Sequence, residues 1–251
     1  MYLSNGELHV ETSSDGARTN SLRKSSRNFF YPQQIVPING VDKMRGGMHI
    51  CSPIFDLPEG KGIFSLAPPH GELRDESWSL RFDKGTKDGI PSEVTECEYF
   101  YEYAKWDTLI SYRVFYRLRR NYLEIKTTMT NVGLTSVPIE LGWHPYFNAP
   151  KGGTIRFASG DLPDISINKA YGSKVLPATG LIIIELNGIG TVEMMLYEGF
   201  RTGKVCIWTD WARKYFCVEP LLSYHEFDTE NGVYLQPEKT FTANFVMRFM
   251  D

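Results

Sequence analysis

Two stretches of alternating apolar and polar side chains between residues 112 and 129 constrain the fold more than any other feature of this sequence. Val114, Tyr116 and Leu118 fall on one face of the first stretch, and the alternation resumes after a polar break at 119–121. A repeat of two places successive side chains on opposite faces of an extended strand, whereas an amphipathic helix needs a repeat near 3.6. The pattern therefore predicts a β-hairpin.

Further segments rich in β-branched and aromatic residues predict more strands, and Gly, Pro, Asn or Asp separates most of them. No stretch sustains the apolar spacing of an amphipathic helix, and the 22 Gly and 14 Pro are scattered, which favours many turns. Because a sheet of about a dozen strands or more usually splits into two packed sheets, we expect an all-β sandwich. The predicted strands are 137–141, 154–158, 181–186, 192–196, 205–208, 215–218 and 245–249.

Composition narrows the class of protein. The 251 residues carry 27 Lys and Arg against 30 Asp and Glu, and a net charge of -3 argues against a nucleic-acid binder. No apolar run approaches the roughly 20 residues that span a bilayer, and the first 40 residues do not read as a signal peptide. Four cysteines without C-x-x-C spacing favour reduced thiols. We expect a single cytoplasmic domain over residues 1–251 with no membrane partner; the sequence leaves the oligomeric state open.

Two acid–base side chains stand in matching surroundings. His144 precedes Pro145 after an apolar segment, and Glu219 precedes Pro220 after the apolar segment 215–218. We expect both at strand ends, because a proline interrupts regular strand pairing. Desolvation there would raise the affinity of the carboxylate for a proton, and such a pair could transfer protons without a metal or cofactor. The alternatives are a histidine bonded to the backbone and a glutamate in solvent.

Three further residues are candidates for binding a ligand. Gly71 lets the backbone beside His70 approach a ligand closely, and Arg74 offers a forked donor for hydroxyl or phosphate oxygens. Arg45 precedes Gly46-Gly47, which also permits close approach to an anion. Ordinary turns, with Arg74 in a surface ion pair, would produce the same local sequence.

The sequence lacks the spacing of the common cofactor and metal motifs. It contains no phosphate-binding glycine loop, no G-x-S-x-G and no H-E-x-x-H. His49, Asp210 and His225 are isolated along the chain, so metal ligation by them has little support. We expect no cofactor and no metal.

As an ordered set, these segments resemble the aldose 1-epimerase (galactose mutarotase-like) superfamily, and within it the hexose-6-phosphate 1-epimerase branch. The resemblance covers nearly the whole chain and implies a large antiparallel β-sandwich, in agreement with the alternation described above. The segments that carry it are Asp15-Gly16-Ala17, Arg45-Gly46-Gly47 with Ile50-Cys51-Ser52-Pro53, His70-Gly71 with Arg74 and Trp78, His144-Pro145-Tyr146-Phe147, and Cys217-Val218-Glu219-Pro220.

The resemblance also implies a reaction and the residues that perform it. Glu219 would be the general base that takes the proton of the anomeric hydroxyl, and His144 the general acid that protonates the ring oxygen. His70 would bind sugar oxygens, and Arg45 with Arg74 would bind a 6-phosphate. The expected activity is interconversion of the α and β anomers of a hexose or hexose 6-phosphate, and the expected partner is that small sugar or sugar phosphate.

Two departures from the family pattern bear on the substrate. Ser52 stands where an aromatic residue is usual, and Asn168 stands where the phosphate-specific branch usually has an aspartate. Asp161 and Asp164 lie nearby in the sequence as alternatives for that aspartate.

Two other functions compete with the epimerase interpretation. One is a non-catalytic sugar-binding or sensing protein on the same fold, with Trp143 or Trp208 as a stacking platform. The other is glycoside hydrolysis, which ranks last because no second carboxylate accompanies Glu219.

Overall fold

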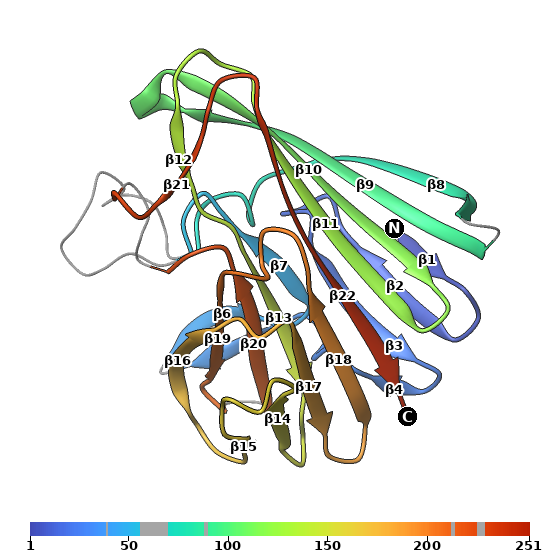
Figure 1. The fold of residues 1–251 in the computed structure, drawn as a ribbon. Coiled ribbons are helices and arrows are strands. Elements are labelled where there is room, and N and C mark those ends of the chain that lie inside the picture. The colour runs from blue at the N-terminus through green and yellow to red at the C-terminus, as the bar shows by residue number, and fades with distance from the viewer. Residues whose placement is uncertain (39, 56–69, 88–89, 212–213, 225–228) are drawn as a thin grey trace.

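A computed structural model describes residues 1–38, 40–55, 70–87, 90–211, 214–224 and 229–251 (Figure 1). Strands dominate these residues, with one short 3-10 helix, η1 (Ala104–Trp106). No helix in the described part of the chain is long and apolar enough to cross a bilayer. The strands are β1 (Tyr2–Ser4), β2 (Leu8–Thr12), β3 (Thr19–Lys24), β4 (Arg27–Asn28), β5 (Gln34–Ile38), β6 (Val41–Arg45), β7 (Met48–Cys51), β8 (Ser79–Lys87), β9 (Ile90–Tyr103), β10 (Thr108–Arg119), β11 (Tyr122–Asn131), β12 (Val137–Ile139), β13 (Gly142–Asn148), β14 (Gly153–Phe157), β15 (Ile165–Ile167), β16 (Gly172–Pro177), β17 (Leu181–Leu186), β18 (Gly190–Leu196), β19 (Lys204–Thr209), β20 (Tyr215–Leu221), β21 (Val233–Leu235) and β22 (Thr240–Met250).

Most strands belong to two nine-stranded antiparallel sheets. The first sheet has the order β1-β2-β3-β7-β13-β20-β19-β16, with β4 beside β3. The second has the order β15-β14-β17-β18-β22-β11-β10-β9-β8, and its long strands run across the upper part of Figure 1. Two separate pairs, β5–β6 and β12–β21, lie outside these sheets. The prediction of a large antiparallel β-sandwich is confirmed.

The hairpin predicted from residues 112–129 is β10 followed by β11. These strands pair from Ile110 with Asn131 to Arg119 with Tyr122, and Arg120 takes a left-handed φ of 46° in the turn. Each of the other predicted segments overlaps an observed strand. The alternation did not single out β1 to β9, β13, β15, β16 or β21, many of which are short or carry charged side chains on their exposed face.

The main apolar core lies between the two large sheets. Trp143 of β13 shows how it is built, because its ring centroid lies 5.9 Å from that of Tyr116 and 6.4 Å from that of Phe245, both in the opposite sheet. Its indole Nε1 donates to Thr127 Oγ1 at 3.2 Å. Trp143 is therefore a core residue with a satisfied polar group, and the suggestion that it is a sugar platform is wrong.

The opposite face of the first sheet is also covered. Alternate residues of β13 and β20, such as Phe147 and Val218, enter the main core, while Tyr146 and Cys217 form a separate small cluster on the other face. Because side chains alternate across a strand, the burial of both faces explains why β13 and β20 are buried almost throughout. That second face carries the polar residues described next.

Candidate active site

A row of polar side chains crosses four neighbouring strands of the first sheet. His49 on β7 pairs in register with His144 on β13, and Cys206 on β19 pairs with Glu219 on β20. The register that sets Tyr146 opposite Cys217 places Glu219 opposite His144. Four residues from distant parts of the sequence therefore lie side by side on one face of the sheet.

His144 and Glu219 lie within strands rather than at strand ends. β13 continues to Asn148 and β20 to Leu221, so the strand-end expectation is wrong. Regular pairing between β13 and β20 nevertheless lapses around the two residues and resumes at Tyr146 with Cys217. Pro145 and Pro220 have no N–H to donate to a neighbouring strand. Burial on both faces keeps the strands extended where their ladder is interrupted.

The imidazole of His144 is enclosed by aromatic rings. It stacks between His49, with centroids 4.9 Å apart, and Tyr146, with centroids 4.6 Å apart. His70 and Trp208 approach it edge-on at 5.1 and 5.8 Å. This packing fixes the plane of the imidazole and turns its Nε2 toward Glu219 Oε1, 3.5 Å away. The buried Nδ1 of His144 has no hydrogen-bond partner among the described residues.

Burial and positive neighbours set the protonation of the histidines. The pKa of His144 lies well below its usual range, first because burial disfavours the imidazolium, and then because protonation of His144 would be opposed electrostatically by His49 and His70 and by the positive charges of Arg45 and Arg74. Burial also lowers the pKa of His49, followed by the effects of His70 and Arg74. At neutral pH both imidazoles are therefore uncharged.

The hydrogen bond of His49 defines its tautomer. Nδ1 lies 3.1 Å from the carbonyl oxygen of Ile50, which can only accept, so Nδ1 carries the proton. Nε2 of the neutral ring is then an acceptor, and the side chain lines the cavity above the sheet. A sugar hydroxyl is a donor that such an atom can bind.

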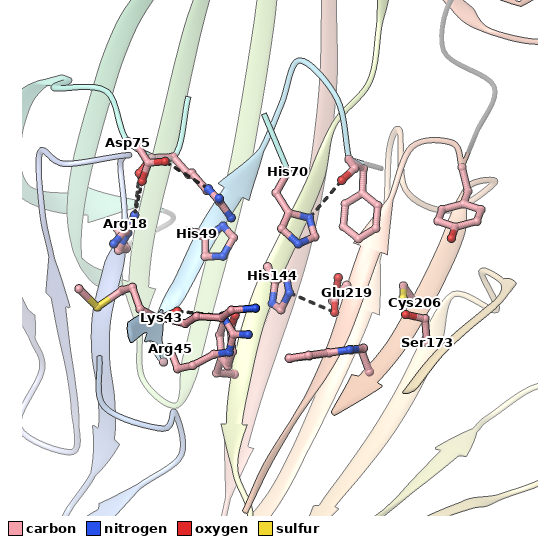
Figure 2. A pocket seen from close by; sticks show the side chains of 17 residues that line it. Arg18, Lys43, Arg45, His49, His70, Asp75, His144, Ser173, Cys206 and Glu219 are labelled. Carbon is pink, nitrogen blue, oxygen red and sulfur yellow. Dashed lines mark hydrogen bonds and ion pairs between the residues drawn. The ribbon is translucent and has the colours of Figure 1, made fainter. Parts of the chain in front are cut away.

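A cavity of about 520 Å³ opens above His144 and Glu219 (Figure 2). This volume is within the range of small-molecule sites. The cavity is lined by four cationic side chains, those of Arg18, Lys43, Arg45 and Arg74, and by only two carboxylates, those of Asp75 and Glu219. The cavity is thus locally positive, although the chain as a whole carries a net charge of -3.

Arg45 enters the cavity from the end of β6. Its Nε donates to the Tyr215 hydroxyl at 3.0 Å and lies 3.5 Å from Asp210 Oδ2. Its guanidinium lies 5.4 Å from the centroid of the Trp208 ring. These contacts hold the stem of Arg45, and its side chain retains 17% exposure.

His70 and Arg74 lie on a segment that hydrogen bonds join to residues 52–55. The backbone N–H and the Nδ1 of His70 each lie 3.1 Å from the carbonyl oxygen of Phe55. Gly71 has a φ of +72°, and a Cβ there would lie 2.1 Å from the carbonyl oxygen of Ser52. Only glycine fits this close approach, which places His70 against the cavity.

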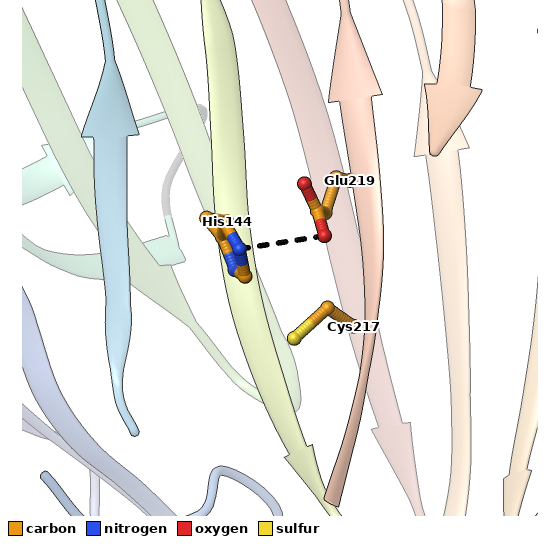
Figure 3. A group of neighbouring side chains, drawn as sticks. All are labelled: His144, Cys217 and Glu219. Carbon is orange, nitrogen blue, oxygen red and sulfur yellow. Dashed lines mark ion pairs between the residues drawn. The ribbon is translucent and has the colours of Figure 1, made fainter. Parts of the chain in front are cut away.

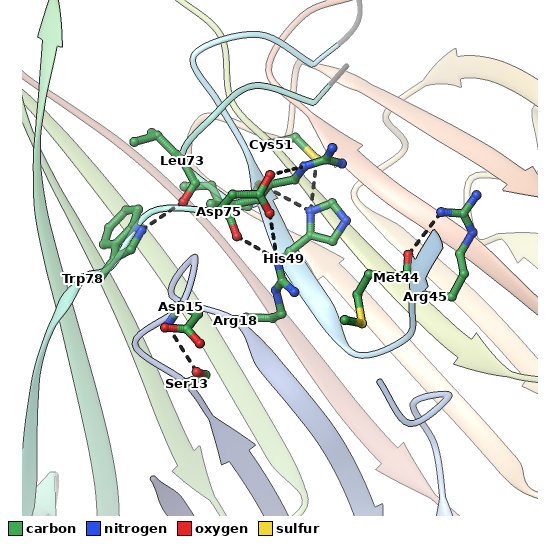
Figure 4. A network of polar contacts seen from close by, with 12 residues as sticks. Ser13, Asp15, Arg18, Met44, Arg45, His49, Cys51, Leu73, Asp75 and Trp78 are labelled. Carbon is green, nitrogen blue, oxygen red and sulfur yellow. Dashed lines mark hydrogen bonds and ion pairs between the residues drawn. The ribbon is translucent and has the colours of Figure 1, made fainter. Parts of the chain in front are cut away.

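A network of polar contacts supports Arg74 (Figure 4). Arg74 Nε donates to Asp75 Oδ2 at 3.3 Å, as expected for the surface ion pair, yet the side chain also lines the cavity. Arg18 donates to the Arg74 carbonyl oxygen at 2.7 Å and lies 3.4 Å from Asp75 Oδ1. Asp75 therefore lies between two arginines at the edge of the cavity.

The structure brings all five sequence-predicted site residues to one cavity: Arg45, His70, Arg74, His144 and Glu219. Their chemical roles stay predictions.

Other candidates lie elsewhere or act differently. Asn168, Asp161 and Asp164 are not among the residues that line the cavity, and Asp164 instead pairs with Arg156 at 3.1 Å. Of the three isolated metal candidates, His49 joins the site, Asp210 pairs with Arg45, and His225 is outside the described residues.

Sequence reasoning missed Arg18, Lys43 and the placement of His49. The order Met48-His49-Ile50-Cys51 alternates, so it could have indicated that His49 and Cys51 face away from the core. Arg18 follows Gly16-Ala17 without a pattern of its own, and only the folded sheet brings it beside Asp75.

Comparison with known proteins identifies the family of this chain. Residues 3–177 match the model of the aldose 1-epimerase family, a stretch that includes His144 but not Glu219. The chain belongs to the aldose 1-epimerase family. A search of curated proteins finds no match.

Solved structures with the same fold cover the whole chain. The Slr1438 protein from Synechocystis sp. PCC 6803 has a TM-score of 0.76 at 15% identity, covering 100% of this chain and 95% of that one. A galactose mutarotase related enzyme from Lactobacillus acidophilus has a TM-score of 0.74 at 17% identity, with coverages of 100% and 97%. A galactose mutarotase-like protein from Lactobacillus casei ATCC 334 has a TM-score of 0.72 at 14% identity, with both coverages at 99%. At these identities the likeness shows the fold.

Proposed function

We propose that this member of the aldose 1-epimerase family is a mutarotase that interconverts the anomers of a hexose 6-phosphate. One observation carries the proposal: His144 and Glu219 face each other at 3.5 Å beneath a cavity lined by more cations than carboxylates. An acid and a base at hydrogen-bonding range of one sugar can act on two of its oxygens. The positive lining suits a substrate that carries a phosphate.

The reaction needs two proton transfers around one ring opening. Glu219 takes the proton of the anomeric hydroxyl, while His144 delivers a proton to the ring oxygen as its bond to C1 breaks. Rotation about the C1–C2 bond of the open aldehyde and reclosure with the roles reversed gives the other anomer. Positioned acid–base groups of this kind typically contribute about 10²- to 10⁴-fold each.

The low pKa of His144 is compatible with this role once an anion is bound. Burial is the first cause of the low pKa, and Arg45 and Arg74 add to it. A phosphate bound between these arginines would offset their charge, so the imidazolium would be less disfavoured in the complex. His144 could then hold the proton that it delivers to the ring oxygen.

Anomer exchange measured by NMR tests the reaction. Freshly dissolved α-glucose 6-phosphate should equilibrate faster with the protein than in buffer, and Glu219→Gln should lower the rate by about 10²- to 10⁴-fold. Glu140→Gln is the matched control, because Glu140 is equally buried but accepts hydrogen bonds from Phe55 N–H and Ser223 instead of lining the cavity.

Either of two results would contradict the proposal: no acceleration with any hexose or hexose phosphate, or an unimpaired Glu219→Gln variant. Calorimetric sugar binding without anomer exchange would instead establish the rival, a non-catalytic sugar-binding protein.

The arginines test the phosphate preference. Hydrogen bonds to charged groups are worth about 1.5–3 kcal/mol each, so Arg45→Ala combined with Arg74→Ala should reduce kcat/KM for the 6-phosphate by at least about 10²-fold. The loss on the free hexose should be much smaller. Equal losses on both sugars would show that the arginines do not recognise phosphate.

A further inference from the structure

The thiol of Cys217 lies beside the acid–base pair but has no part in the reaction proposed above. His144, Cys217 and Glu219 are all buried, and each offers one ligand atom, these atoms lying within 4.8 Å of one another. Figure 3 shows the sulfur and the carboxylate on the same side of β20, both facing His144. The arrangement follows from the register, since residues 217 and 219 share a face and His144 lies opposite on β13.

The spacing is close to that of a zinc site. Bonds of about 2.0–2.1 Å to nitrogen or oxygen and 2.3 Å to sulfur, at tetrahedral angles, place ligand atoms about 3.3–3.6 Å apart. His144 Nε2 and Glu219 Oε1 already lie 3.5 Å apart. Because the ligand atoms lie within 4.8 Å of one another, the sulfur needs to move by about 1.2 Å or less, which rotation of the cysteine side chain can supply.

The donor set selects the kind of ion. One nitrogen, one sulfur and one oxygen suit Zn²⁺ and related thiophilic ions, whereas Mg²⁺ and Ca²⁺ prefer oxygen alone. The thiol loses its proton to solvent when the ion binds, so thiolate and carboxylate together neutralise a divalent charge. Three protein ligands leave a fourth position, and the cavity above His144 and Glu219 provides space for a water there.

We propose that His144, Cys217 and Glu219 form a binding site for Zn²⁺ or a similar thiophilic dication, and that this ion reversibly inhibits the enzyme. The ion would occupy both groups of the acid–base pair, which a metal-free epimerase needs for proton transfer. The inhibition rests on the proposed function, but binding of the ion does not.

Cobalt absorption tests binding without any sugar. Titration of the full chain with Co²⁺ should produce a thiolate-to-cobalt charge-transfer band and tetrahedral d–d bands that saturate at one ion per chain. Cys217→Ala should abolish the charge-transfer band. Cys97→Ala is the matched control, because Cys97 is a buried cysteine on β9 in the main core, and it should retain the band.

Two further variants distinguish the neighbouring ligands. Glu219→Gln should keep the charge-transfer band and weaken Co²⁺ binding, since the carboxylate is lost but the sulfur remains. Cys206→Ala should keep the band as well, because Cys206 is not part of the proposed ligand set. No charge-transfer band in the wild type, or one that survives Cys217→Ala, would overturn the site.

Inhibition is measured for each protein as the ratio of its anomer-exchange rate with Zn²⁺ to its rate without Zn²⁺. Zn²⁺ should slow anomer exchange by the wild type and a chelator should restore it. Cys217→Ala should need at least about 10-fold more Zn²⁺ for the same inhibition, because even the loss of an outer-shell partner of a metal ligand typically costs about 10-fold in affinity. A cobalt band without zinc inhibition would refute the regulatory part of the proposal. Absence of anomer exchange altogether would count against the proposed function, while the cobalt result would still decide the metal site.

Discussion

The substitution His49→Phe tests whether His49 is uncharged in the folded protein. The pKa of His49 and that of His144 both lie well below the usual 6.5, mainly through burial. In the unfolded chain each imidazole takes up a proton as the pH falls below about 6.5, whereas in the folded chain it stays neutral. The unfolded state then binds more protons, so the free energy of unfolding must fall on acidification.

The size of this effect follows from the two titrations. A histidine with an unfolded pKa of about 6.5 loses at most about 2 kcal/mol of stabilisation between about pH 7 and 5, the limit reached when the folded imidazole takes up no proton. His49 and His144 together should therefore account for at most about 4 kcal/mol. His49→Phe retains a ring against His144 but has no group to titrate at that position. The part of the acid-induced stability loss that is due to buried histidines should therefore be about half as large in this variant.

Urea unfolding across this pH range is the assay. The difference in unfolding free energy between wild type and His49→Phe should shift in favour of His49→Phe by up to about 2 kcal/mol from about pH 7 to 5, whatever the baseline cost of the substitution. Groups common to both proteins cancel. His9→Phe provides a control at a histidine outside the cavity. Parallel pH profiles for wild type and His49→Phe would refute the reasoning.

Three substitutions test other features of the site. Glu140→Gln should lower the free energy of unfolding by about 1–3 kcal/mol in urea, because an amide cannot accept all the hydrogen bonds of the buried carboxylate. Gly71→Ala should lower the free energy of unfolding by about 1–3 kcal/mol or more in the same assay. The added Cβ would lie 2.1 Å from the Ser52 carbonyl oxygen, and the backbone φ of +72° disfavours a side chain. Trp208→Ala should raise KM for the sugar phosphate more than it lowers kcat, because it removes the ring beside the Arg45 guanidinium.

The fold was predictable where one face of a strand meets the core and the other meets solvent. The hairpin of β10 and β11 shows this, because its burial alternates along both strands. β13 carried no such signal, since it is buried on both faces and its sequence does not alternate. The expectation that Pro145 ends a strand failed for the same reason: packing on both sides holds the chain extended beyond the missing N–H.

The residue types at the site were predictable, but their convergence was not. His144, Glu219 and Arg45 stand out locally through flanking prolines and glycines. Their meeting depends on the sheet order β7-β13-β20-β19, which joins segments far apart in sequence, and no local pattern specifies it. Arg18 carries no signal because its place depends on that order and on the segment at 70–75.

The row of His49, His144, Glu219 and Cys206 has a consequence for how such a protein can change. If any of the four strands slipped by one residue, its member of the row would point into the main core instead. The positions of these four side chains therefore depend on strand register. Arg45 and Arg74 instead lie at the end of the β5–β6 hairpin and on the segment at 70–75, outside the large sheet that carries this row. If the proposed roles hold, exchanging those two segments for others would change the substrate preference while leaving the proposed proton-transfer pair in place.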